Sequence, residues 1–131
     1  MKPKTRNWLN IAQDDYEVAG QLFKSKKYLY TMFFCQQAIE KAIKAAYYDK
    51  NEETPPRKHN LTSLAEATGL LSELERVDGD LLDILTQYYI ESRYSEDRDA
   101  LAKKCTRPFT ENILKRTGDA FTWLKSRLKQ P

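Results

Sequence analysis

The sequence predicts an all-α fold, an up-and-down four-helix bundle with an additional short helix. Apolar residues recur at the three-and-four spacing of one helical face in several long segments. Only 4 Gly and 5 Pro interrupt the 131 residues, and we find no alternation of apolar and polar residues that would indicate strands. The length predicts one domain, residues 1–131, and short connections favour antiparallel neighbouring helices.

The first two helices are predicted from their apolar periods. The first runs from about Asn7 to Phe23 and ends at the lysine-rich segment 24–27. Its apolar face consists of Trp8, Ile11, Ala12, Tyr16, Ala19, Leu22 and Phe23. The second has the most regular seam, which consists of Tyr28, Met32, Cys35, Ile39, Ala42 and Ala46. Both helices should therefore pack along their length.

The middle of the chain should contain a loop and a short helix. Residues 50–58 are polar and include Pro55-Pro56, which cannot continue a helix. Asn60 can cap a short helix that stops at Gly69, with Ser63 and Glu66 as an alternative capping-box start.

Two further helix starts are expected between residues 72 and 81. Ser72 and Glu75 repeat the capping pattern. After residues 78–80 another helix should follow and fray around 92–95, with an apolar face that consists of Leu81, Leu82, Leu85, Tyr88 and Tyr89.

The final helix has a clear predicted start. Residues 96–104 are strongly charged, and their pattern leaves open whether they are helical. Thr106 can cap the last helix, and Pro108 is tolerated in its first turn. Its buried side is predicted to consist of Ile113, Leu114, Ala120, Phe121, Leu124 and Leu128.

Composition indicates a water-soluble, cytoplasmic protein. The 22 basic and 19 acidic residues are spread along the chain, so the net charge of +3 is a weak argument for nucleic-acid binding. Cys35 and Cys105 are expected to be buried free thiols rather than a disulfide or a zinc site. No targeting signal and no membrane span are expected, because the longest uncharged run, residues 28–39, is too short.

The richest polar cluster is on the second predicted helix. Gln37, Glu40, Lys41 and Lys44 lie at offsets of three, four and seven and should share one face. Such a face can hold an anion, with Gln37, Lys41 and Lys44 as its ligands. The simpler interpretation, which we favour, is an ion pair between Glu40 and Lys44, with the rest of this face as a solvated stripe.

His59 is the only histidine of the chain, beside Arg57 and Lys58. It can touch a substrate, but a structural histidine bonded to the backbone near Asn60 is the favoured interpretation. Arg93 can offer a planar donor fork to a phosphate or carboxylate, or equally an ion pair with a neighbouring helix, for instance at Glu40.

Other chemical signals are missing from the sequence. It has no glycine-rich phosphate loop and no cluster of metal ligands, and we expect no cofactor and no metal. Tyr88, Tyr89 and Tyr94 could form a stacking platform for single-stranded nucleic acid, although packing is the better explanation.

Taken together, these elements resemble the HEPN domain family (higher eukaryotes and prokaryotes nucleotide-binding) over nearly the whole chain. The resemblance rests on the run from Gln36 to Ala45, on His59-Asn60-Leu61 with Leu64, and on Arg93-Tyr94; Trp8, Tyr16, Ala19, Tyr28 and Tyr89 also match. It implies an up-and-down bundle, frequent homodimers, and a pairing with a separate minimal nucleotidyltransferase, often as a toxin–antitoxin module.

The chain departs from this family in its catalytic motif. Many members are metal-independent RNases whose Arg is followed after four to six residues by His. Here Arg57 precedes His59 by two positions, and no histidine follows Arg93. Ser95 also stands where similar chains often have Pro after the Arg-Tyr pair.

Three functions remain. The first is a non-catalytic, homodimeric module that binds a nucleotidyltransferase partner, with a nucleotide or RNA as a further candidate ligand through Gln37, Lys41, Lys44 and Arg93. Glu40, His59 and Tyr94 would then orient the site. The alternative is a metal-independent RNase with a rearranged site built from His59 and from Arg57 or Arg93. A purely structural assembly subunit is a third, blander option.

Overall fold

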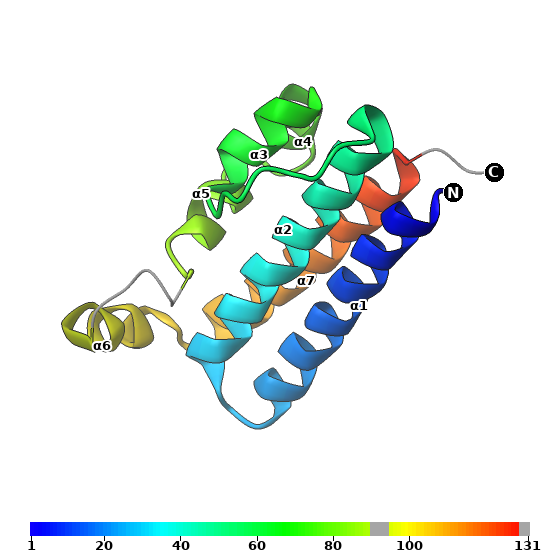
Figure 1. Ribbon diagram of the computed structural model, residues 1–131. Coiled ribbons are helices and arrows are strands. Elements are labelled where there is room, and N and C mark those ends of the chain that lie inside the picture. The colour runs from blue at the N-terminus through cyan, green and yellow to red at the C-terminus, as the bar shows by residue number, and fades with distance from the viewer. Residues whose placement is uncertain (90–94, 129–131) are drawn as a thin grey trace.

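The computed structural model describes residues 1–89 and 95–128, and only the backbone of residues 95–97. All regular structure in these residues is helical, which confirms the predicted all-α class. Three long helices lie side by side: α1 (Pro3–Lys24), α2 (Tyr28–Asn51) and α7 (Arg107–Ser126), of which α1 runs opposite to the other two (Figure 1). A series of three short helices, which follows α2 in the chain, packs beside it.

α1 and α2 both extend beyond their predicted ends. α1 begins at Pro3 rather than Asn7, because proline is compatible with the first helical turn, where its missing N–H is not needed. α2 continues through Asn51, and Glu52 then adopts a left-handed conformation with a φ of 55°. The loop predicted at residues 50–58 therefore occupies residues 52–60 instead.

Three short helices take the place of one long third member. α3 (Leu61–Thr68) is capped by the Asn60 side chain, which accepts from the Ser63 N–H at 3.0 Å, and ends at Gly69 with a φ of 79°. Both predicted caps are confirmed, whereas the alternative start at Ser63 is wrong. Since these turns redirect the chain every few residues, no single helix can span this side of the bundle.

The second and third short helices differ from their predicted bounds. α4 (Leu71–Val77) starts before Ser72, without a side-chain cap, so the capping pattern predicted at Ser72 is wrong. α5 (Leu81–Thr86) ends earlier than predicted, because the chain turns after Thr86 and places Tyr88 in the core at 2% exposure. The predicted fraying at 92–95 falls largely outside the described residues.

The remaining helices complete the chain. The charged segment whose structure the sequence left open forms α6 (Ser95–Lys104), beside the end of the bundle (Figure 1). The Thr106 side chain caps α7 by accepting from the Phe109 N–H at 3.3 Å, as predicted. The predicted buried side of α7 is also confirmed, except that Leu114 is only partly buried.

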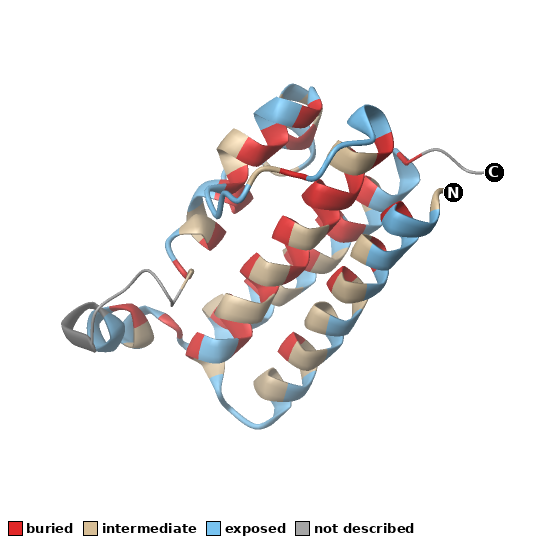
Figure 2. Ribbon diagram, in the orientation of Figure 1, coloured by how far each residue is buried: buried red, intermediate tan, exposed pale blue. Residues whose placement is uncertain are grey.

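α2 lies at the centre of the core. It contacts α1, α3, α5, α6 and α7, and its buried residues follow its whole length (Figure 2). Cys35 and Cys105 are both buried and free, which confirms the predicted state of the two thiols. None of the described helices is long and apolar enough to cross a membrane.

Candidate functional site

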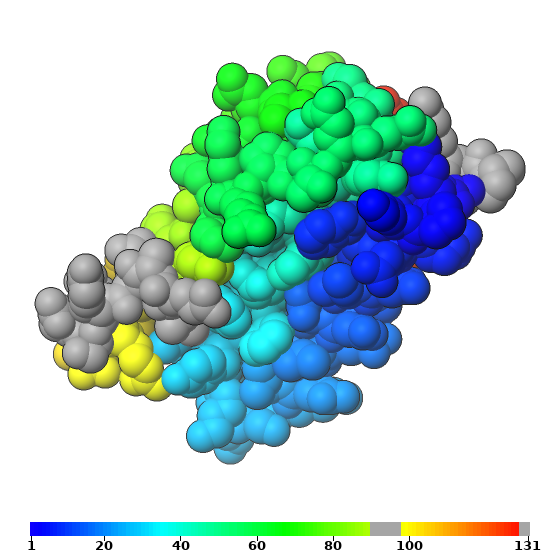
Figure 3. All heavy atoms as spheres, in the orientation of Figure 1, coloured from blue at the N-terminus to red at the C-terminus, as the bar shows by residue number. Residues whose placement is uncertain are grey.

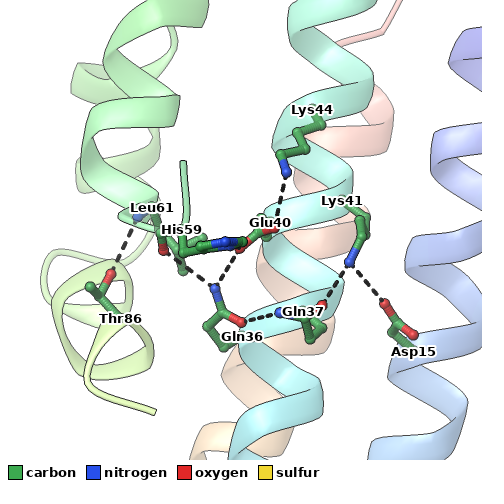
Figure 4. A network of polar contacts seen from close by, with 9 residues as sticks. All are labelled: Asp15, Gln36, Gln37, Glu40, Lys41, Lys44, His59, Leu61 and Thr86. Atoms are coloured by element: carbon green, nitrogen blue, oxygen red, sulfur yellow. Dashed lines mark hydrogen bonds and ion pairs between the residues drawn. The ribbon is translucent and has the colours of Figure 1, made fainter. Parts of the chain in front are cut away.

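The centre of the polar network is the carboxylate of Glu40, which lies in the buried part of α2 at 2% exposure. Gln36 donates from Nε2 to Glu40 Oε1 at 2.8 Å, and Lys44 donates from Nζ to Glu40 Oε2 at 3.0 Å. The third partner is His59, whose Nδ1 lies 3.0 Å from Oε1 (Figure 4). Both carboxylate oxygens are therefore occupied.

The ionised form of Glu40 is stabilised by these partners. Burial disfavours the charged form, but hydrogen bonds from Gln36, His59 and Lys44 outweigh it, so the pKa of Glu40 lies below its ordinary value. An ionised carboxylate can only accept hydrogen bonds. The contact with His59 is therefore a donation from Nδ1–H, and in the neutral ring Nε2 keeps its lone pair.

His59 is held from two further sides. Its ring stacks on the ring of Tyr89, with centroids 3.8 Å apart and planes inclined by 12°. Its backbone carbonyl accepts a hydrogen bond from Gln36 Nε2 at 3.4 Å. The side chain nevertheless stays 45% exposed. The ring is thus fixed in orientation and still open to solvent, which are the requirements for an acid–base group.

The loop that carries His59 is anchored at both ends. Pro55 is buried, and Figure 3 shows the loop lying over α2 between α3 and the start of α1. Two residues after His59, the Leu61 N–H donates to Thr86 Oγ1 at 3.3 Å (Figure 4). The position of His59 over Glu40 therefore depends on α5 as well as on α2.

The same network continues toward α1. Gln37 donates to Gln36 Oε1 at 2.7 Å and accepts from Lys41 Nζ at 2.7 Å. Lys41 Nζ also lies 3.7 Å from Asp15 Oδ2 of α1. Burial raises the pKa of Asp15, and the neighbouring Lys41 opposes that shift. Lys41 thus links the two helices.

Two interpretations of these residues need correction. Gln37 with Lys41, and Glu40 with Lys44, share one face of α2 as predicted. The predicted ion pair between Glu40 and Lys44 is present at 3.0 Å, but the two residues are only 2% and 8% exposed. Gln37 and Lys41, expected in a solvated stripe, are instead partly buried and bonded to Gln36 and Asp15. His59 bonds through its ring to a carboxylate rather than to the backbone near Asn60, because the loop crosses directly over Glu40.

The other predicted site residues are placed as follows. Arg57 is exposed on the loop. Arg93 and Tyr94 lie outside the described residues, as does any ion pair of Arg93 with Glu40. The sequence reasoning missed Gln36, although an amide beside Gln37 within an uncharged run was a usable signal. It also missed Asp15, which has no distinguishing pattern on α1.

Together these features define an all-α bundle with an internal carboxylate–histidine network and no group of potential metal ligands in residues 1–89 and 95–128. The HEPN domain model matches residues 5–127, so the chain belongs to the HEPN family, as the sequence motifs predicted.

The fold is also similar to that of a solved structure. The crystal structure of TT1696 from Thermus thermophilus superposes with a TM-score of 0.78, covering 97% of this chain and 100% of that chain at 23% identity. At this identity the likeness shows the fold alone. No curated protein matches the chain.

Proposed function

We propose that this chain is a non-catalytic HEPN-type module that forms a homodimer and binds a minimal nucleotidyltransferase partner in a toxin–antitoxin-like system. The observation that carries the proposal is the internal bonding of the polar face on α2. Its charges neutralise one another: Lys44 pairs with Glu40, and Lys41 with Asp15. The chain also has a single histidine at the wrong spacing from arginine for the RNase motif.

Co-purification tests the partner half of this proposal. The tagged chain, expressed in its native host, should retain a small nucleotidyltransferase that mass spectrometry identifies, and light scattering should give twice the chain's 15.4 kDa for the free protein. A strictly monomeric protein that retains no nucleotidyltransferase would contradict both statements.

The nucleotide half of the proposal concerns Gln37, Lys41, Lys44 and Arg93. A nucleotide phosphate could bind there only if Lys41 exchanged its contacts with Gln37 and Asp15 for the ligand. Calorimetric titration with ATP and GTP should therefore give weak binding that Lys41→Ala and Arg93→Ala abolish. Lys24→Ala, at the far end of α1, is the matched control. If no nucleotide gives a heat of binding, nucleotide binding is excluded, and the proposed partner binding is unaffected.

A metal-independent RNase is the second candidate, and the His59–Glu40 contact is the observation that favours it. A histidine whose Nδ1–H is held by a carboxylate and whose ring is half exposed can transfer protons through Nε2. Arg57 or Arg93 would steady the phosphate.

RNA cleavage in the presence of a chelator decides between the two functions. The RNase predicts cleavage that disappears in His59→Ala and persists in Lys58→Ala, the neighbouring exposed control. If the chain is a non-catalytic module, neither the wild type nor the two variants should cleave RNA. Cleavage that survives His59→Ala indicates a contaminant.

A further inference from the structure

A groove runs between α1 and α7, on a different part of the molecule from the polar network. It consists of two adjoining hollows of about 320 and 260 Å³, which share Gln13, Phe121 and Lys125 in their walls. One extends toward Tyr16 and Lys115, and the other toward Arg6. From Arg6 to Tyr16 the α1 wall is about 15 Å long at 1.5 Å per residue, or about three helical turns.

The floor of the groove consists of buried apolar side chains. Leu9 and Phe121 close it from the two helices at 7% and 4% exposure. The absence of a side chain at Gly118 lets Tyr16 lie against α7, where its hydroxyl donates to the Leu114 carbonyl at 3.0 Å. Leu9 and Phe121 therefore close the floor, and the apolar residues of the groove that stay partly exposed are Met1 and Tyr16.

The rim of the groove is basic. Arg6, Lys115 and Lys125 line it, and the described lining residues supply a single acid, Asp119. None of the three cations forms an ion pair within the described part of the chain. Lys125 Nζ lies 5.5 Å from the Phe121 ring centroid and thus remains over the floor. These charges contrast with Lys41 and Lys44, which are already paired.

We infer that the α1–α7 groove is a docking surface for an acidic amphipathic helix of the protein partner. The inference rests on the proposed partner binding and assigns it a location. An incoming helix would place apolar residues against the partly exposed Met1 and Tyr16, and its acidic residues would pair with the basic rim. The three-turn length matches apolar anchors at positions i, i+3, i+4 and i+7.

The chemistry favours a helix over a nucleic acid. Binding to a strand of RNA needs many phosphate contacts and exposed aromatic rings on which bases can stack. The groove supplies three cations, and its Phe121 ring is almost fully buried under Lys125. Charge complementarity to a short acidic segment is therefore the better fit.

Fluorescence anisotropy with a labelled peptide tests the groove directly. The probe is an amphipathic helix of about four turns with Leu on one face and Glu on its flanks, and the same peptide with Lys in place of Glu is its control. The Lys115→Glu/Lys125→Glu variant should weaken binding of the acidic peptide at least about tenfold. Lys103→Glu/Lys104→Glu makes the same charge change on exposed residues of α6 and should leave binding within about twofold. Circular dichroism confirms that both variants fold, and Lys115→Ala/Lys125→Ala should give an intermediate loss.

Binding of the nucleotidyltransferase to the same variants separates this inference from the proposed function. Loss of that partner with the groove variant, but not with the α6 variant, supports both. A partner that binds both variants equally overturns the groove and leaves the proposed function standing. A peptide that binds in the expected way while no nucleotidyltransferase binds supports the groove and removes the proposed function. If the acidic peptide does not bind, or if single-stranded RNA competes for the groove more strongly, the inference is wrong.

Discussion

Removal of the Glu40 carboxylate is the most informative perturbation of this fold. The Glu40→Ala change leaves the Lys44 ammonium without its ion-pair partner at a site that is 8% exposed. It also removes the acceptor for Gln36 Nε2 and for His59 Nδ1. Breaking one partner of a buried pair costs about 3–5 kcal/mol. Because the Lys44 side chain can still reach solvent, we expect about 3 kcal/mol, which lowers the midpoint of thermal unfolding by about 10 °C.

A double-mutant cycle identifies the origin of that loss. Lys44→Met in the Glu40→Ala background removes the unpaired charge, so part of the lost stability should return. We expect a coupling of about 1–2 kcal/mol between the two positions, measured by urea denaturation followed by circular dichroism. The reasoning is refuted if Glu40→Ala costs less than about 1 kcal/mol, or if the two changes are additive.

The same site should give a definite pH dependence. The pKa of Glu40 is lowered in the folded protein, so its contribution to stability is present at neutral pH. It is lost as the pH falls below the ordinary pKa of a glutamate, about 4.3, and then through the lower folded-state pKa. The stability difference between wild type and Glu40→Gln should therefore be large at pH 7 and shrink at pH 3. A difference that stays constant over this pH range would show that the charge of the Glu40 carboxylate does not contribute to stability.

Further predictions concern two glycines and two thiols. Gly118→Ala should destabilise the protein by about 1–3 kcal/mol, since the new Cβ would lie 2.4 Å from the Tyr16 hydroxyl oxygen. Gly20→Ala is its control and should stabilise by about 0.5–1 kcal/mol, because nothing lies within 4 Å of that Cβ. Burial raises the pKa of the Cys35 thiol to about 12, and burial also raises the pKa of Cys105. Neither thiol should react with a chromogenic thiol reagent at pH 8 until denaturant is added; rapid labelling of the native protein would contradict this.

Local chemistry was enough to predict much of this protein from its sequence. The seam of α2, the caps at Asn60 and Thr106 and the stop at Gly69 depend on residues within one or two turns of each other. The shared face of Glu40 and Lys44 follows from helical spacing alone. Family membership was also within reach, because its motifs are short and contiguous.

Tertiary packing decided what those local elements do. The helical period shows which side of α2 is polar, but not that a loop 19 residues further on covers Glu40 with His59. Nor can spacing predict that Tyr89 stacks on that ring, or that α1 and α7 leave a groove with a basic rim. Such contacts join segments far apart in the chain, and their geometry depends on how the helices pack together. The sequence alone therefore determined the helices and their polar faces, and the packed bundle decided which of those faces were buried and which stayed exposed.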